Sequence, residues 1–136
     1  MLQVYSLAKD GSRRLSANFR LREFACRDGS DPVFIDTRLV QVLQSVRDHF
    51  GKPVTVTSGY RTPAYNKKVG GAAYSQHCCG RAADIRVAGV SVEQLAAYAE
   101  KLLPDTGGIG RYPVRSGRPT GWVHIDTRPA KSRWKG

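Results

Sequence analysis

The sequence predicts a single α+β domain, in which short strands form a small sheet flanked by helices. The chain has 136 residues, which fits one compact domain able to bury its own core. Segments with apolar residues at helical spacing and recognisable caps alternate with short β-branched runs bounded by turn residues. No stretch approaches the ~18 consecutive apolar residues that a membrane span requires, so no membrane insertion is expected.

The N-terminal part of the chain carries few signals of regular structure. Residues 1–17 are mixed and basic, so a loose N-terminal arm is expected there, followed by one domain over residues 18–136. Residues 1–10 lack a basic start, an apolar core and a small-residue cleavage site. We therefore expect synthesis in the cytoplasm without a signal peptide.

The first helix is predicted over residues 37–50. Asp36 is a natural N-cap and Gly51 a natural stop. His49 lies near the C-terminal end, where a role with the helix dipole or with solvent is expected. The predicted buried face consists of apolar residues at helical spacing, namely Leu39, Val42, Leu43, Val46 and Phe50.

A strand and a short helix are predicted next. Residues 54–58 form a β-branched run typical of a strand. Thr62 is an N-cap with Pro63 at the first helical position, and this helix is predicted to end near Val69. The glycine-rich connector at residues 70–74 lacks the Gly-Lys-Ser/Thr ending of a phosphate-binding loop, so no nucleotide site is expected.

The second half of the chain adds a helix and further strands. Ser91 and Gln94 have the spacing of a capping box and predict the start of the helix. A basic loop at residues 114–120 precedes the last strand, and a basic tail with one tryptophan follows it. Strands are predicted at residues 82–87, 109–113 and 122–127.

The charge of the chain indicates a polyanionic partner. Its 22 Lys and Arg residues against 11 Asp and Glu give a net charge of +11. Nucleic acid is the usual partner of such a protein, but a bacterial wall with teichoic acids and peptide carboxylates is also a polyanion. A well-solvated basic surface without a specific partner is the third interpretation. No helix-turn-helix, zinc-finger or RNA-binding signature is recognisable, which argues against nucleic acid.

The three cysteines, Cys26, Cys78 and Cys79, are expected to be reduced thiols. Adjacent cysteines rarely pair with each other, so at most one ordinary disulfide could form, from Cys26 to one of the other two. A second interpretation is that Cys78 or Cys79 binds a metal or acts as a nucleophile. Neither lies in a Cys-x-x-Cys arrangement, which weakens it.

The strongest functional signal lies in residues 75–84, which predict half of a metal site. They contain His77, one of only 3 histidines, and an aspartate seven residues later, Asp84. Gly80 would let the backbone turn so that both side chains reach one point, and zinc accepts an imidazole nitrogen beside a carboxylate oxygen. The best-placed third ligand is His124, in a short apolar run.

Three motifs in order give the chain a family resemblance. They are Ser-Gly-Tyr-Arg at residues 58–61, Ser-x-His-x-x-Gly-x-Ala-x-Asp at 75–84, and Val-His-Ile-Asp at 123–126. The chain resembles the zinc D-alanyl-D-alanine carboxypeptidase superfamily of peptidoglycan peptidases, in its short bacterial and phage branch, over roughly residues 18–134. The resemblance implies the hedgehog/DD-peptidase fold, with a small antiparallel sheet flanked by helices. It also implies that Phe19, Leu21 and Phe24 pack on the core.

The resemblance further implies the residues of the site. His77, Asp84 and His124 would bind zinc and leave the fourth tetrahedral position for water, as in catalytic zinc sites. Arg61 would hold a substrate carboxylate or carbonyl, although it could instead be a structural arginine that bridges two loops. The other residues expected to contact substrate are Tyr60, Ser75, Gln76 and Trp122.

The chain departs from part of this superfamily at the catalytic acid. Several members have an acidic residue three positions before the last histidine, where this chain has Gly121. The short branch instead has an acid two positions after it, which is Asp126 here. On a strand, residues 124 and 126 point to the same face, about 7 Å apart. Asp126 is therefore expected to be the general base, with orientation of a ligand imidazole as the alternative.

The expected function is that of a monomeric zinc metallopeptidase that acts on peptidoglycan peptide stems or cross-links, as a carboxypeptidase or an endopeptidase. Its basic surface would bind anionic cell-wall polymers rather than nucleic acid, and a phage or prophage lysin released by a holin is an attractive setting. One alternative is a catalytically inactive, zinc-containing wall-binding module, supported by Gly121. The other is a basic nucleic-acid-binding protein, supported by Trp134 among basic residues.

Overall fold

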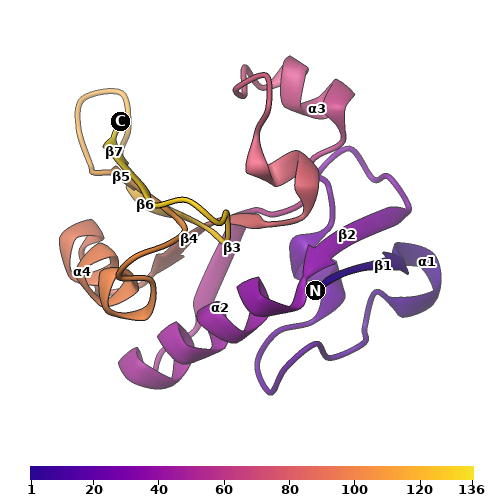
Figure 1. Ribbon diagram of the computed structural model, residues 1–136, viewed down its shortest axis with the longest axis horizontal. Coiled ribbons are helices and arrows are strands. Elements are labelled where there is room, and N and C mark those ends of the chain that lie inside the picture. Colours follow the sequence, from indigo (N-terminus) through magenta and orange to yellow (C-terminus); the bar gives the residue numbers. More distant parts are fainter.

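The computed structural model describes all 136 residues and has a five-stranded sheet at its centre (Figure 1). The neighbouring strands are antiparallel, except that the edge strand β7 runs parallel to β5. The α+β class is therefore confirmed, with one parallel edge strand added. In sheet order the strands are β3 (Val54–Ser58), β4 (Ala82–Val87), β6 (Trp122–Asp126), β5 (Gly108–Tyr112) and β7 (Ser132–Lys135).

The two long helices, α2 (Thr37–Phe50) and α4 (Val92–Leu102), lie on the same side of the sheet (Figure 1). Both have the predicted caps. The Asp36 carboxylate accepts a hydrogen bond from the backbone N–H of Arg38, and Gly51 ends α2 in the left-handed conformation. The capping box that begins α4 is also present. No helix in the structure is both long enough and apolar enough to span a bilayer.

The sheet has one apolar and one polar face, because side chains alternate along each strand. Toward the helices it presents buried residues such as Ile85, Ile109 and Ile125. The residues next to these along the strands, among them Asp84 and His124, therefore point to the opposite face. The sheet thus separates the hydrophobic core from the side that carries the functional motifs.

The N-terminal segment differs from the loose arm that was expected. Residues 2–6 form strand β1 (Leu2–Ser6), which pairs antiparallel with β2 (Pro32–Asp36), and a short helix α1 (Leu7–Asp10) follows. The reason is that Val33 and Ile35 anchor β2 in the core and leave its edge open for pairing. The predicted burial is confirmed for Phe19 and for two residues of the 3-10 helix η1 (Leu21–Phe24), Leu21 and Phe24.

A lobe formed by α3 (Pro63–Lys68) and the 3-10 helix η2 (Gln76–Cys79) lies on the other side of the sheet from α2 and α4 (Figure 1). Helix η2 is the turn of the metal motif, and it ends at Gly80 with φ +71°. A Cβ at Gly80 would lie 2.5 Å from the carbonyl of Phe34 in β2. The turn is therefore tight because β2 packs directly against it.

Two glycines allow this contact to be measured. Gly51 also has a positive φ, but a Cβ there meets nothing within 4 Å. We expect Gly51→Ala to lower the free energy of unfolding by about 1–2 kcal/mol, the cost of a left-handed alanine. Gly80→Ala should cost roughly 3 kcal/mol or more, because backbone must also move. Chemical denaturation measures both, and equal losses would contradict the close packing of β2 on η2.

Candidate metal centre

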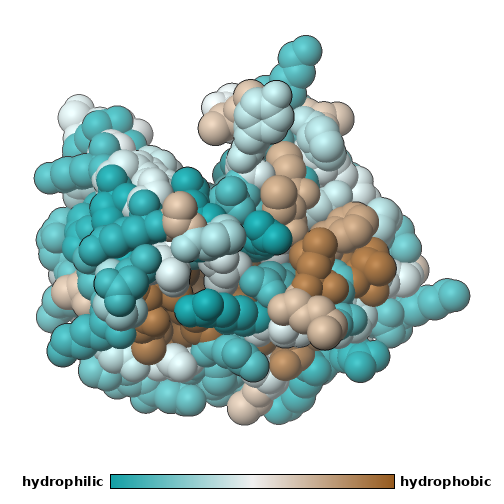
Figure 2. All heavy atoms as spheres, in the orientation of Figure 1, coloured by the Kyte–Doolittle hydropathy of each residue, from teal (hydrophilic) through white to brown (hydrophobic).

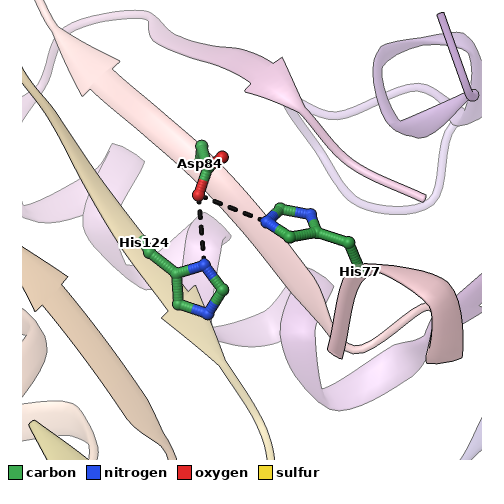
Figure 3. A group of neighbouring side chains, drawn as sticks. All are labelled: His77, Asp84 and His124. Atoms are coloured by element: carbon green, nitrogen blue, oxygen red, sulfur yellow. Dashed lines mark hydrogen bonds and ion pairs between the residues drawn. The ribbon is translucent and has the colours of Figure 1, made fainter. Parts of the chain in front are cut away.

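The three predicted ligands meet at one point on the polar face of the sheet (Figure 3). Asp84 of β4 and His124 of β6 are directly opposite each other in the antiparallel register. His77 reaches the same point from η2. All three residues are buried, and their candidate ligand atoms lie within 4.8 Å of one another. The structure therefore brings together residues that are up to 47 positions apart in the sequence.

The tautomer of His77 follows from its hydrogen bond to the backbone. Its Nδ1 lies 2.7 Å from the carbonyl oxygen of Gly59. A carbonyl oxygen only accepts, so Nδ1 carries the proton and donates it. The lone pair is then on Nε2, which lies 3.3 Å from Oδ1 of Asp84. In its neutral form, His77 thus directs the Nε2 lone pair to the centre of the group.

His124 is oriented in the same way by a carboxylate. Its Nε2 lies 2.7 Å from Oδ2 of Asp126, and its Nδ1 lies 3.1 Å from Oδ1 of Asp84. When Nε2 donates to Asp126, the lone pair on Nδ1 points to the centre. Burial lowers the pKa of His124, but the hydrogen bonds to Asp126 and Asp84 outweigh it, so the pKa is raised overall.

The arrangement fits a divalent metal. Two imidazole lone pairs and Oδ1 of Asp84 converge, and these three atoms cannot satisfy one another without a proton or a cation between them. Burial raises the pKa of Asp84, but hydrogen bonds from His124 and His77 outweigh it and hold the pKa well below its usual range. Two nitrogens and one anionic oxygen form a ligand set that zinc accepts.

Asp126 does not occupy the position expected of a general base. Its side chain is 0% exposed and is absent from the lining of the cleft. Oδ1 accepts hydrogen bonds from the backbone N–H groups of Gly108 and Arg128, and the Arg128 guanidinium contacts both carboxylate oxygens. With its acceptor sites occupied, Asp126 is placed to orient His124, the alternative role considered from the sequence.

Arg61 holds the carboxylate of Asp84 in place. Its guanidinium donates to Oγ of Ser58 at 3.0 Å, to Oδ1 of Asn66 at 3.2 Å and to Oδ2 of Asp84 at 3.4 Å. It therefore links the end of β3 to α3 and to the metal site, which corresponds to the structural interpretation. Arg61 also lines the cleft, so a contact with substrate is compatible with this role.

A cleft of about 550 Å³ opens above the three ligands, between the η2 lobe and the sheet. Ser75, Gln76 and Trp122 line it, as expected. Tyr60 does not: it is buried, and its ring packs 5.3 Å from that of Phe34. Its two neighbours contact the site instead: the Gly59 carbonyl lies against His77, and Arg61 donates to Asp84.

Several residues of the cleft lining were not predicted from the sequence. Tyr112 and Trp134 line it together with Arg128. Trp134 arrives through β7, which pairs with β5 beside Gly110, and its ring lies 5.0 Å from that of His124. An isolated tryptophan in a basic tail was the only signal of this position. The parallel pairing that places it depends on tertiary structure.

The remaining candidates lie outside the group. Cys26, Cys78 and Cys79 form no disulfide, and no cysteine belongs to the metal-ligating cluster. Burial raises the pKa of the Cys78 thiol, which disfavours a nucleophilic thiolate. His49 stacks on Tyr98 with ring centroids 3.8 Å apart.

Gly121 has no space for the acid that other superfamily members place there. A Cβ would lie 2.6 Å from the carbonyl oxygen of Tyr112 and 2.7 Å from a methyl group of Val92. The close approach of β5 and α4 thus excludes a glutamate at this position without rearrangement. The glycine is part of the packing of the sheet.

Comparison with known proteins assigns the chain to a family. The family model described as Peptidase M15 matches residues 16–126. The Haemophilus influenzae protein named "Probable peptidoglycan L,D-endopeptidase MepK" is 32% identical over 110 residues, covering 75% of this chain and 55% of the relative. The chain thus spans about half the length of this curated relative. The match includes the His77, Asp84 and His124 positions, and the chain belongs to the peptidase M15 family.

Proposed function

We propose that this protein is a zinc peptidase that hydrolyses peptide bonds in the stems or cross-links of peptidoglycan. The observation that carries the proposal is the convergence of His77 Nε2, His124 Nδ1 and Asp84 Oδ1 at the base of a cleft, with both outer ring nitrogens already hydrogen-bonded. The name of the Haemophilus influenzae relative supports peptidoglycan as the substrate and an endopeptidase as the reaction type.

The residues of the chain would hold the zinc and fix its geometry. A bound zinc ion polarises a scissile carbonyl and lowers the pKa of a water molecule, which supplies the nucleophile at neutral pH. Gly59 and Asp126 hold the two imidazole rings in the required tautomers. Arg61 keeps the Asp84 carboxylate in place, and Arg128 does the same for Asp126.

The two arginines also give the cleft a positive lining next to the ligands. Arg61 and Arg128 both line it, and their carboxylate partners leave other guanidinium N–H groups available. Such donors stabilise the negative charge that develops on a carbonyl oxygen during hydrolysis. They also suit a substrate carboxylate.

A second candidate function is a zinc-containing wall-binding module without hydrolytic activity. One observation favours it: among the residues that line the cleft, Asp84 is the only acid, and Asp126 is enclosed. A general base that accepts the proton of water is therefore not separately provided by a carboxylate. Measurement of turnover distinguishes the two functions.

The proposed setting is the bacterial cell wall. The net charge of +11 would hold a monomeric enzyme on anionic wall polymers at low ionic strength. Release by a phage-type holin remains the proposed route to the wall.

Metal content tests the ligand set. We expect the purified protein to bind one zinc ion. Loss of a residue that only hydrogen-bonds to a metal ligand lowers metal affinity about 10–100-fold. We expect a larger loss of zinc affinity for each of the three ligand variants, His77→Ala, Asp84→Ala and His124→Ala. His49→Ala is the matched control, because His49 stacks on Tyr98 away from the group. Mass spectrometry of bound metal measures the result, and unchanged zinc in His124→Ala would contradict the site.

The role of Asp126 is tested by Asp126→Asn. The amide would present an N–H group to His124 or force its other tautomer, so we expect zinc affinity to fall about 10–100-fold. A base that acts on water would instead lower kcat at unchanged zinc affinity. Asp105→Asn, at an exposed aspartate, is the control. Zinc titration and kcat at saturating zinc measure the two effects separately.

Digestion of purified sacculi tests the activity itself. Mass spectrometry should find new stem fragments with the zinc-loaded protein and none with a chelated sample, and their masses identify the bond. The L,D bond is the first to examine, given the relative's name. Absence of fragments from walls of several chemotypes, despite bound zinc, would refute hydrolysis and leave the wall-binding module.

A further inference from the structure

A second hollow adjoins the metal centre at Asp84, and His77 is not part of its lining. It has a volume of about 540 Å³ and shares Asp84 and Trp122 with the first cleft. Figure 2 shows the molecule deeply notched between two projections, which in Figure 1 correspond to the loop between β5 and β6 and to the α3 lobe. A bound chain can therefore extend past the ligands into this second hollow.

The lining of the second hollow is strongly basic. Arg86, Arg115 and Arg118 line it, and the only acidic residue is Asp84. Asp84 already contacts Arg61 and both histidines. None of the three arginines forms an ion pair with a carboxylate of the chain, whereas other arginines such as Arg111 and Arg133 do. The hollow therefore has unmatched positive charge.

The positions of the arginines are fixed by the fold. Arg86 follows Asp84 by two residues on β4, so both point to the same face, about 7 Å apart along the strand. Arg115 and Arg118 lie on a tight turn closed by mutual backbone hydrogen bonds of 3.0 and 2.8 Å. The Arg118 guanidinium stacks over Trp122 at 5.0 Å from the ring centroid. Arg86 is thus about two residues along β4 from Asp84, and Arg115 and Arg118 line the same hollow as these two residues.

Arg118 differs from the other two in its own contacts. It donates to the carbonyl oxygens of Pro113 and Gly136, which anchors the loop to β5 and to the end of β7. Arg86 and Arg115 are exposed, and their side chains make no hydrogen bond in the structure. These two guanidinium groups are therefore available to a ligand.

We propose that Arg86 and Arg115 form a subsite for a free carboxylate of the peptide stem, so that the enzyme selects stems with ionised rather than amidated carboxyl groups. This inference rests on the proposed function. A stem carries carboxylates on the same short peptide as the scissile bond, within reach of a subsite that adjoins the zinc ligands. Guanidinium groups bind a carboxylate in bidentate fashion, and amidation removes the charge that they recognise.

The test uses two synthetic stem peptides that differ only in a free carboxylate or its carboxamide. With the zinc-loaded protein, we expect a KM roughly 10-fold or more lower for the free acid. Arg86→Gln and Arg115→Gln should each raise the KM for the acid and leave that for the amide unchanged, so that the preference disappears in the double variant. Arg38→Gln, which removes an exposed arginine on α2, is the charge-matched control and should keep the preference.

The outcomes separate this inference from the proposed function. Equal KM values of the wild-type protein for acid and amide, or a preference that persists in the double variant, would overturn the subsite while leaving the peptidase intact. If neither peptide is cut, the proposed function fails, and calorimetry with the same peptides decides the subsite alone. Arginine-dependent tighter binding of the acid would uphold it, and equal affinities would overturn it.

A separate experiment tests whether Arg86 and Arg115 bind the phosphate groups of a wall polymer rather than a stem carboxylate. Polyglycerol phosphate is titrated into the wild-type protein and into Arg86→Gln, Arg115→Gln and Arg38→Gln, which each lose one positive charge. Loss of its binding in Arg86→Gln and Arg115→Gln but not in Arg38→Gln, together with equal KM values for acid and amide peptides, would assign the arginines to a wall polymer and overturn the stem-carboxylate subsite. Equal binding by the three single variants is the result expected here.

Discussion

The antiparallel pairing of β4 with β6 is the constraint on which the candidate site depends. It places Asp84 directly opposite His124, and both side chains point away from the core because their neighbours Ile85 and Ile125 are fully buried. A slip of one residue in either strand would turn its candidate ligand toward the hydrophobic layer beneath α2 and α4. The burial of the core thus fixes the register, and the register fixes the ligand geometry.

Around these ligands, each polar atom is held by a specific partner. The outer nitrogen of His77 donates to the Gly59 carbonyl, and that of His124 donates to Asp126, which is itself held by Arg128 and by the Gly108 N–H group. Buried charges are costly unless they are paired and hydrogen-bonded. These hydrogen bonds therefore lower the energetic cost of burying the carboxylates. They also leave the ring lone pairs that face Asp84 free for a cation.

Arginine contributes to this surface in two ways, although its charge is the same throughout. Arg61 and Arg128 are largely buried and paired with carboxylates that support the metal ligands. Arg86 and Arg115 lie on the neighbouring part of the same face without acidic partners. The excess of basic residues in the composition thus includes a local feature: unpaired guanidinium groups next to the proposed reaction centre.

Local signals in the sequence were sufficient for the helices and pointed to the three candidate ligands that the structure brings together. Asp36, Gly51 and the Ser91–Gln94 box act on backbone groups within a few residues, so the bounds of α2 and α4 could be predicted. Long-range pairing decided the rest: β1 adds to β2, β7 brings Trp134 beside His124, and Asp126 is enclosed by Gly108 and Arg128. These contacts join segments whose separation carries no local pattern, so the sequence by itself determined which chemical groups are present, and only the tertiary structure decided which of them face the cleft.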